Sequence, residues 1–187
     1  MIGPEFPAVL DAAARGDEEA FGRLWYDLQP RLLRYFIVAS PAAAEDLASE
    51  TWLGVVRGID RFRGNEPAFR AWVFTIARHE LLDWRRRAAR RVTEDQPAIG
   101  PVEQAAPDDP ATAAVEGLST RRALAVIATL PADQAEAVAL RVLAGLDVDR
   151  VAGIMGKRPG TVRVLTHRGL RRLAEQLGAE ARIRGVV

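Results

Sequence analysis

The residues with the clearest chemical potential lie near the end of the chain, in KRPGTVRVLTHRGLRR, residues 157–172. This segment contains six lysine and arginine side chains and no acidic residue. The formal net charge of all 187 residues is only +1, so the positive charge is concentrated here rather than spread evenly. A guanidinium presents a fork of donors that suits phosphates and guanine edges. The segment therefore indicates binding of nucleic acid.

The elements around this segment predict how it is positioned. Asp147 can cap a short helix, VDRVAGIMG, that ends near Gly156, and Pro159 and Gly160 open the next helix. Two helices joined by a short glycine-containing turn predict a helix-turn-helix, whose second helix enters the major groove. One side of this second helix can pack on the helix before it. Helical spacing gives the residues of that side as Val162, Leu165, Gly169, Leu173 and Leu177.

The polar faces of the second helix carry the candidate DNA contacts. In such a motif the first turns meet base edges and later basic residues meet phosphates. The candidates for base contact are Thr161, Arg163, Val164 and His167, and those for phosphate contact are Arg168, Arg171 and Arg172. The alternative is a solvated amphipathic helix whose basic residues offset its own C-terminal dipole. The turn, the short preceding helix and the lack of acids favour DNA binding.

Composition argues against several other kinds of chemistry. The chain has no cysteine, which excludes disulfides, thiolate metal sites and a cysteine nucleophile. His79 and His167 are its only histidines; His79 and Asp83 are four residues apart, but no third ligand lies nearby. We expect neither metal nor cofactor. Without a phosphate-cradling glycine loop or clustered metal carboxylates, an enzyme acting on nucleic acid is disfavoured.

The sequence shows no sign of membrane insertion or export. No apolar run approaches the roughly 20 residues that a membrane span requires. The N-terminal residues MIGPEFPAVL lack the basic and then apolar layout of a signal peptide. We therefore expect a cytoplasmic protein.

Charge divides the chain into blocks that predict its domains. Residues 57–91 carry a net charge of +6, whereas residues 92–120 carry −6 and contain no basic residue. The acidic stretch is also rich in proline and poor in large apolar residues, so it cannot bury enough surface to offset its ordering entropy. We predict domains at 1–92 and 118–187, joined by a flexible acidic linker at 93–117.

Both flanks of the linker show helical periodicity. Asp17 can cap a helix that follows Gly16, and a further helix in AEDLASETWLGVVRGIDRF is broken by a loop at 63–67. A long helix follows through FRAWVFTIARHELLDWRRRAARR, and PADQAEAVALRVLAG predicts another between Pro131 and Gly145. No segment alternates with period two. The predicted class is all-α, with two small helical domains.

These motifs also resemble a known family. AEDLASETWLGVVRGIDRF followed by FRAWVFTIARHELLDWRRR resembles region 2 of the bacterial sigma-70 family, in its extracytoplasmic-function group. LPADQAEAVALRVLAGLDVDRVAGIMGKRPGTVRVLTHRGLRRL resembles region 4 of that group. The resemblance implies an alternative sigma factor that binds core RNA polymerase, recognises −35 and −10 promoter elements and promotes DNA melting. The implied partners are the clamp helices of the largest polymerase subunit, the beta-subunit flap, promoter DNA and an anti-sigma factor.

Region 2 of the family docks on core polymerase through its second helix. The resemblance assigns this role to Glu45, Asp46, Glu50 and Trp52. Acids on one turn of an otherwise apolar helix suit a basic protein surface and avoid DNA. The alternatives are stabilisation of the helix N-terminus by Glu45 and Asp46, and core packing by Trp52.

The −10 element is read in the family by the next helix and the loop before it. The residues that the resemblance assigns to this role are Arg63, Asn65, Arg78, His79, Asp83, Trp84, Arg85, Arg86 and Arg87. An extruded base needs stacking surfaces and polar edges, and arginine follows the adjoining backbone. The chain departs from common family patterns at His79 and at residues 164–166, which affects promoter readout rather than the role.

One alternative from a different class remains open. An ordinary helix-turn-helix regulator, which binds duplex DNA without core polymerase, would account for the C-terminal half. It would leave the motif AEDLASETW and the basic segment at residues 57–91 without a function.

Overall fold

The computed structural model describes residues 1–94 and 112–184, and the side chains of residues 1–90 and 120–177. All regular elements in these ranges are helical, which confirms the all-α class. The α-helices are α1 (Phe6–Ala14), α2 (Glu18–Ala39), α3 (Ala44–Gly58), α4 (Glu66–Glu94), α5 (Thr112–Ala128), α6 (Ala132–Val138), α7 (Val148–Met155) and α8 (Pro159–Arg184). The other helical turns are η1 (Gly3–Glu5), η2 (Pro41–Ala43) and the π-helical η3 (Ala139–Leu143).

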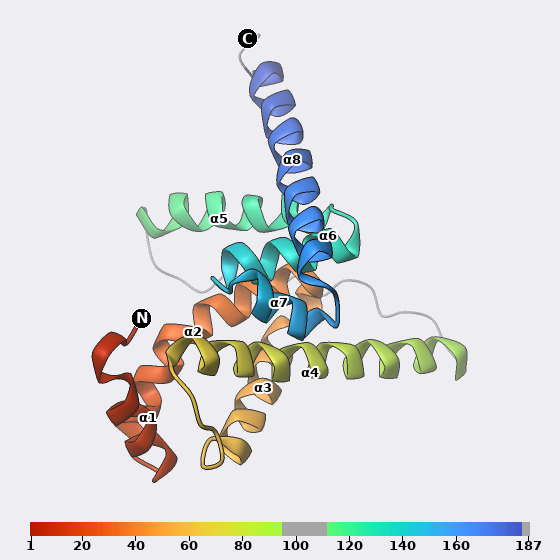
Figure 1. The fold of residues 1–187 in the computed structure, drawn as a ribbon. Coiled ribbons are helices and arrows are strands. Elements are labelled where there is room, and N and C mark those ends of the chain that lie inside the picture. Colours follow the sequence, from red (N-terminus) through yellow and green to blue (C-terminus); the bar gives the residue numbers. More distant parts are fainter. Residues whose placement is uncertain (95–111, 185–187) are drawn as a thin grey trace.

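Helices α1 to α4, here called the N-terminal unit, form the lower part of Figure 1. The Asp17 side chain accepts a hydrogen bond from the backbone N–H of Ala20 at 2.8 Å, which confirms the predicted cap of α2. Gly16 has a φ of 91°, a left-handed conformation that suits glycine, and ends the turn after α1. Helix α1 therefore folds back along α2.

A loop connects α3 to α4 and fixes where α4 begins. The Asn65 side chain accepts a hydrogen bond from the backbone N–H of Ala68 at 3.0 Å and so caps α4. Behind the loop, Phe62 packs against Phe69 and Trp72 with ring centroids 5.3 and 5.1 Å apart. The loop thus stands on an aromatic cluster, and α4 is held against α3.

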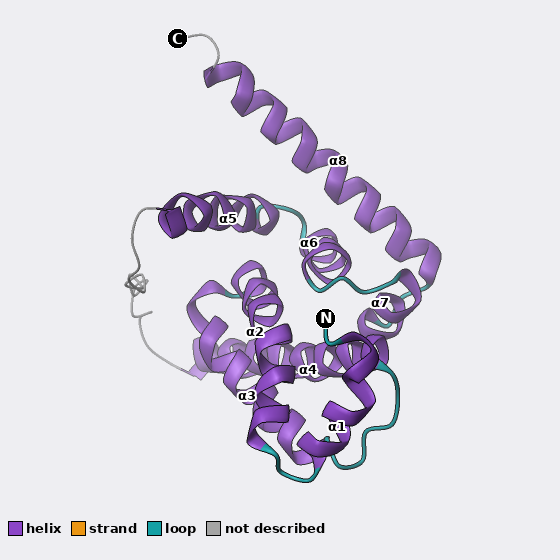
Figure 2. Cartoon of the chain, turned by 90° about the vertical axis from the view of Figure 1, so that its left-hand side faces the viewer, coloured by secondary structure: helices purple, strands orange, loops and turns teal. Residues whose placement is uncertain are grey.

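Helices α5 to α8 form the C-terminal unit. The Asp147 side chain accepts a hydrogen bond from the backbone N–H of Arg150 at 2.8 Å, which confirms the second predicted cap. Gly156 follows α7 with a left-handed φ of 63°, and α8 begins three residues later. This is the predicted helix-turn-helix. Helix α8 packs on α6 and α7 and then projects away from the other helices (Figure 2).

Two segments differ from the prediction. The helix expected from Pro131 to Gly145 is α-helical only to Val138, and the π-helical η3 follows, with the backbone N–H of Ala144 bonded to the carbonyl oxygen of Ala139 at 3.0 Å. Helix α5 begins at Thr112, inside the stretch expected to be a flexible linker. Local composition gives no weight to long-range packing, and α5 packs against α2. The rest of the predicted linker, residues 95–111, lies outside the described residues.

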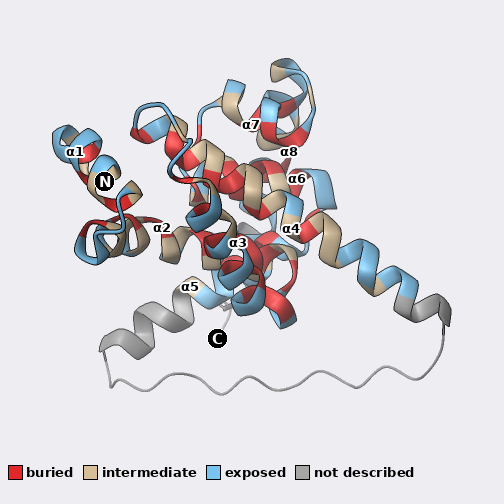
Figure 3. Ribbon diagram, turned by 90° about the horizontal axis from the view of Figure 1, so that it is seen from below, coloured by how far each residue is buried: buried red, intermediate tan, exposed pale blue. Residues whose placement is uncertain are grey.

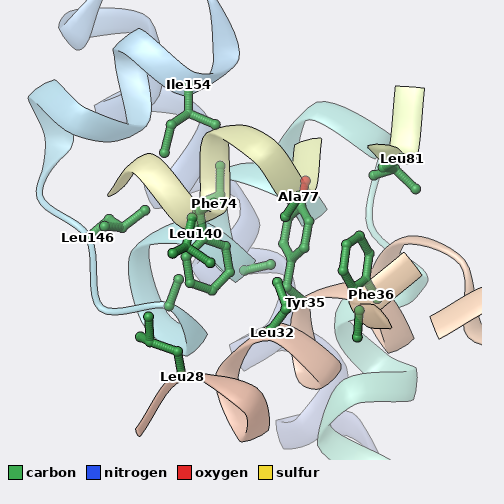
Figure 4. Close-up of a cluster of buried hydrophobic side chains, with 14 of the residues drawn as sticks. Leu28, Leu32, Tyr35, Phe36, Phe74, Ala77, Leu81, Leu140, Leu146 and Ile154 are labelled. Atoms are coloured by element: carbon green, nitrogen blue, oxygen red, sulfur yellow. The ribbon is translucent and has the colours of Figure 1, made fainter. Parts of the chain in front are cut away.

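The two units share one hydrophobic core. Leu28 and Leu32 of α2 and Phe74 of α4 belong to the same buried cluster as Leu140 of η3 and Ile154 of α7. Figure 4 shows these side chains gathered where the units meet. Helices α6 and α7 and η3 therefore pack directly on α2 and α4.

A search of the described helices finds none that combines the length and the apolar character of a membrane span.

Candidate nucleic-acid interface

Helix α8 presents its basic face to solvent. The side chains predicted to contact bases, Thr161, Arg163, Val164 and His167, are all exposed, as are Arg168, Arg171 and Arg172. Within the described part of the chain, Arg163, Arg168 and Arg172 make no ion pair, and Arg171 pairs only with Glu175, at 3.2 Å on the same helix. Pairs between exposed groups are weak. The whole basic face is therefore available to a polyanion.

The opposite face of α8 explains its orientation. Val162 is fully buried, and Leu165 and Leu173 pack partly buried against the core. Gly169 lies so close to α6 that an added Cβ would be 2.7 Å from Cγ2 of Val138. Lys157, before α8, pairs with Asp133 of α6 at 2.9 Å. The predicted packing side is thus correct except at its end, because Leu177 is half exposed.

The second basic surface lies at the C-terminal end of α4, which extends beyond the packed helices (Figure 3). Arg85, Arg86 and Arg87 are exposed, and Trp84 is partly buried against the core. Arg85 donates a hydrogen bond to the carbonyl oxygen of Ala39 at 3.1 Å. Three arginines on one turn give this end of α4 a strong positive field.

An exposed carboxylate accompanies these arginines. Asp83 forms an ion pair with Arg86, and the hydrogen bond from Arg86 lowers the pKa of the Asp83 carboxyl. The pair restrains Arg86 while leaving it at the surface. His79, one turn earlier, is exposed.

The loop before α4 contains two further predicted residues, Arg63 and Asn65, and the side chain of each already takes part in hydrogen bonding. The Arg63 guanidinium donates hydrogen bonds of 2.7 Å to the carbonyl oxygens of Asp60 and Phe62. Asn65 is exposed, but its side-chain oxygen is already used as the cap of α4. Between them Gly64 has a φ of 158°, and an added Cβ would be 3.0 Å from the Phe62 ring. The loop is therefore tightly built, with polar groups on its outside.

Arg78 stands apart from the other predicted residues. Its Nε lies 2.8 Å from Oε1 of Glu136 on α6, in an ion pair whose two side chains are only 20% and 18% exposed. Tyr35 of α2 donates a longer hydrogen bond, 3.4 Å, to the same carboxylate oxygen. Burial raises the pKa of the Tyr35 phenol, and the Glu136 carboxylate raises it further. Arg78 is thus held inside the contact between the units.

The acidic residues of α3 lie where the sequence predicts. Glu45, Asp46 and Glu50 are exposed on the N-terminal part of the helix. Trp52, predicted in the same group, is only 7% exposed and packs edge-on against Phe21. Its indole N–H donates to Oε1 of Gln29 at 2.7 Å. Trp52 therefore fixes α3 against α2 and supports the acidic face from behind.

Apolar side chains that the sequence reasoning did not assign lie beside these acids. Leu53 is 49% exposed and Val56 is 56% exposed, and they follow Glu50 at spacings of three residues along the same side of α3. Tyr26 of α2 is 75% exposed and lines, with Val56, an apolar hollow between α2 and α3. Helical spacing groups Val56 with the packing residues Leu47 and Val55, and its exposure corrects that expectation, whereas Leu53 falls outside this packing side.

The described residues offer no metal centre: no three of their histidine, cysteine, aspartate and glutamate side chains are grouped closely enough to hold an ion. The His79 and Asp83 pair remains without a third ligand there.

Comparison with known proteins matches both halves of the chain. Residues 25–91 match the family model of Sigma-70 region 2, and residues 114–173 match that of Sigma-70, region 4. The chain is 35% identical over 178 residues to the ECF RNA polymerase sigma factor BldN of Streptomyces coelicolor, covering 93% of this chain and 66% of that protein. It is 31% identical over 185 residues to the ECF RNA polymerase sigma factor SigD of Mycobacterium tuberculosis, covering 96% and 87%.

Solved structures agree with the fold. The sigma factor RpoE from Bartonella quintana, solved with the anti-sigma factor NepR, matches with a TM-score of 0.63 and 27% identity, over 84% of this chain and 96% of that chain. CnrH, solved with the cytosolic domain of CnrY, also matches with a TM-score of 0.63. Its 20% identity, over 93% of this chain and 97% of that chain, supports the fold alone.

Proposed function

This chain belongs to the extracytoplasmic-function group of the sigma-70 family of RNA polymerase sigma factors, and from that membership we propose how its surfaces divide the work of initiation. It acts as an alternative sigma factor in the cytoplasm and catalyses no reaction itself. Its two domains correspond to the N-terminal unit, α1 to α4, and the C-terminal unit, α5 to α8.

Helix α8 reads the −35 element in the major groove. The support is its exposed basic face, which carries no ion pair to another element within the described residues. Arg163 is placed to form a bidentate contact to guanine, and Val164 to meet a thymine methyl group. Thr161 and His167 add polar contacts to bases, and Arg168, Arg171 and Arg172 contact phosphates.

The loop at 63–65 and helix α4 read the −10 element. The tight loop around Gly64 supports this assignment, because it holds Arg63 and Asn65 at the surface beside α4. His79 and Asp83 line the next part of the single strand. Arg78 joins them when its ion pair with Glu136 is released. Trp84 and the three arginines after it grip the duplex upstream, where the basic end of α4 extends from the body.

Helix α3 docks on core polymerase. Glu45, Asp46 and Glu50 meet the clamp helices of the largest subunit, and Leu53, Val56 and Tyr26 supply the apolar part of the contact. Acids beside exposed apolar side chains support this, since interfaces combine a desolvated centre with a polar rim. Trp52 holds the docking helix in place. The C-terminal unit meets the beta-subunit flap.

An anti-sigma factor is the expected inhibitor. The support is that the Bartonella quintana sigma factor, 27% identical to this chain, was solved in complex with the anti-sigma factor NepR. This chain has no cysteine, so a redox signal would have to be sensed by the partner.

The observation that carries the proposal is the pairing of an exposed basic recognition helix with an exposed acidic and apolar docking helix on one chain. The test is to mix the purified chain with bacterial core RNA polymerase, separate the mixture by gel filtration and assay initiation on a pool of genomic fragments. We expect co-elution and new, discrete start sites.

Glu50→Lys should abolish co-elution while the chain stays folded by circular dichroism. The matched control is Asp11→Lys, the same charge reversal at an exposed position of α1. Normal binding of Glu50→Lys would refute the docking assignment. Failure of the unchanged chain to co-elute, with binding to duplex DNA alone, would favour an ordinary helix-turn-helix regulator.

A further inference from the structure

The beginning of α4 is held by residues that lie before α1. Glu66, the first residue of α4, is only 9% exposed. Its two carboxylate oxygens accept hydrogen bonds from the backbone N–H groups of Ile2 and Gly3, at 3.1 and 2.9 Å. Figure 1 shows residues at the N-terminal end beside the start of α4. Because a charged acceptor strengthens both hydrogen bonds, this carboxylate fixes residues 2 and 3 against α4.

A buried arginine balances the charge of the same carboxylate. Arg70, one turn further along α4, is buried, and its Nη2 lies 3.5 Å from Oε1 of Glu66 and 3.9 Å from Oδ2 of Asp27 on α2. A buried charge that loses its partner is costly, which keeps the Glu66 side chain between Arg70 and the two backbone N–H groups. Glu66 therefore joins residues 2 and 3 to α4 and, through Arg70, to α2.

An aromatic contact accompanies these hydrogen bonds. Phe6, the first residue of α1, is buried, and the centroid of its ring lies 5.7 Å from that of Phe69. The Phe69 ring lies in turn 5.3 Å from that of Phe62, the residue directly before the loop at 63–65. Residues 2–6 therefore contact the residue after the loop directly, through Glu66, and the residue before it through Phe69.

The loop has open space on the side that faces α1. A hollow of about 470 Å³ lies there, lined by Leu10 of α1 and by Phe62, Arg63 and Gly64. The loop is tightly built within itself, but no packed side chain of α1 fills this hollow. The position of the loop relative to α1 therefore depends on the residues at its two ends.

We propose that Glu66 is a positioning residue for −10 recognition: by tying residues 2 and 3 to the first turn of α4, it sets where Arg63 and Asn65 are presented to DNA. Glu66 does not touch the DNA, because its carboxylate is buried and occupied. The residues that it holds lie outside the match to Sigma-70 region 2, which begins at residue 25. The link to −10 recognition rests on the proposed function of the loop, whereas the hold on α4 does not.

The hold on α4 can be measured in the free chain by amide hydrogen exchange. Glu66→Gln keeps the shape of the side chain but removes its charge, and exchange within residues 2–6 and 62–69 should become about tenfold faster, because charge-assisted hydrogen bonds are lost. Glu5→Gln is the matched control, since it removes an exposed ion pair with Arg23 and should leave exchange within 62–69 unchanged. Equal exchange of the two variants over residues 62–69 would overturn the proposal.

A second variant reaches the same contact without changing α4 or leaving Arg70 unpaired. Ile2→Pro removes one of the two N–H donors at a residue whose φ of −79° suits proline, and Ile2→Val keeps the donor as its control. Exchange within residues 62–69 should rise in Ile2→Pro, by a smaller factor than in Glu66→Gln, because one hydrogen bond remains. If Ile2→Pro exchanged no faster than Ile2→Val, residues 2 and 3 would not hold α4.

Initiation by the holoenzyme separates positioning from simple destabilisation. The measurement compares promoters that differ by single bases in the −10 element with promoters that differ by single bases in the −35 element. Glu66→Gln should reduce discrimination among the −10 variants by about tenfold, the scale of one mismatched base pair, and leave −35 discrimination and co-elution with polymerase unchanged. An equal loss of activity on all promoters would make Glu66 a residue of general stability and overturn its positioning role.

Failure of this inference can be told apart from failure of the proposed function. Faster exchange within residues 62–69 together with unchanged −10 discrimination, in a holoenzyme that initiates, would overturn the link between Glu66 and −10 recognition. Failure of the unchanged chain to initiate with core polymerase would refute the proposed function instead. The exchange measurement on the free chain would still decide whether Glu66 holds α4.

Discussion

Helices α8 and α4 carry similar numbers of arginines but differ in what those arginines already hold. On α8, Arg163, Arg168 and Arg172 are exposed and have no ion pair within the described residues. On α4, Arg78 holds Glu136, Arg85 holds a backbone carbonyl and Arg86 holds Asp83. An exposed arginine is therefore not always an unoccupied one, and the contacts in the structure show which arginines already hold a partner.

The largest expected effect on promoter binding comes from Arg163 of α8, whose side chain has no ion pair within the described residues. Arg163→Ala should cost about 1–3 kcal/mol of promoter binding if the contact is bidentate to a guanine, and the loss should be confined to −35 sequences that carry that base. Binding of holoenzyme to a set of −35 variants measures the loss. Equal losses on all promoters would make Arg163 a phosphate contact.

The packing under α8 is the next target. Gly169→Ala places a Cβ 2.7 Å from a stiff valine side chain of α6 and should lower the free energy of unfolding by about 1–2 kcal/mol. Gly153→Ala, at an exposed position of α7 with open space around it, is the control and should raise stability by about 0.5–1 kcal/mol. Urea titration gives both values. If Gly169→Ala proved as stable as Gly153→Ala, α8 would not be held by this close approach.

A phosphate contact on α8 should appear in the salt dependence. Arg172→Ala should weaken binding to all promoters about equally and reduce the slope of log affinity against log salt by about 1. Fluorescence anisotropy of holoenzyme on one promoter over a range of salt concentrations measures that slope. A selective loss on some promoters with an unchanged slope would place Arg172 on a base instead.

The smallest expected effect on promoter binding concerns the exposed ion pair between Asp83 and Arg86 on α4. Asp83→Asn should release Arg86 and raise affinity for the upstream duplex by less than about threefold, since exposed pairs contribute little. The pKa of Asp83 is lowered, so the carboxylate stays charged at and below neutral pH and the pair is lost only as pH falls through that lowered pKa. Promoter affinities of the two proteins at pH 7 measure the effect. Weaker binding by Asp83→Asn would show that the contribution of Asp83 to the −10 contact exceeds the gain from releasing Arg86.

Local features of the fold could be predicted from the sequence because their causes are local. The caps at Asp17 and Asp147 and the buried position of Val162 depend on residues within one or two turns, and the structure confirms all three. Helix α5 and the π-helical turn of η3 both pack against α2, which is distant in sequence, and local composition carries no information on such contacts.

The residues of the candidate site also divide into those whose position follows from local spacing and those whose position depends on long-range contacts. The exposure of Arg163 follows from helical spacing, whereas the partner of Arg78 is 58 residues away in sequence on another helix. The burial of Trp52 likewise depends on Gln29 and Phe21 of α2. Residue type and spacing therefore indicate which side chains are able to bind DNA, and long-range contacts decide which of them are already occupied.

The π-helical turn at η3 has a consequence for how this chain can change over evolution. A π-helical turn accommodates one residue more than an α-helix would use over the same path. Deleting a single residue between 139 and 143 would therefore leave one continuous α-helix over the same path, and the recognition helix after it would keep its direction. A deletion within α6, which holds no extra residue, would instead rotate everything after it by about 100°. Single-residue deletions should therefore be tolerated better at η3 than within α6.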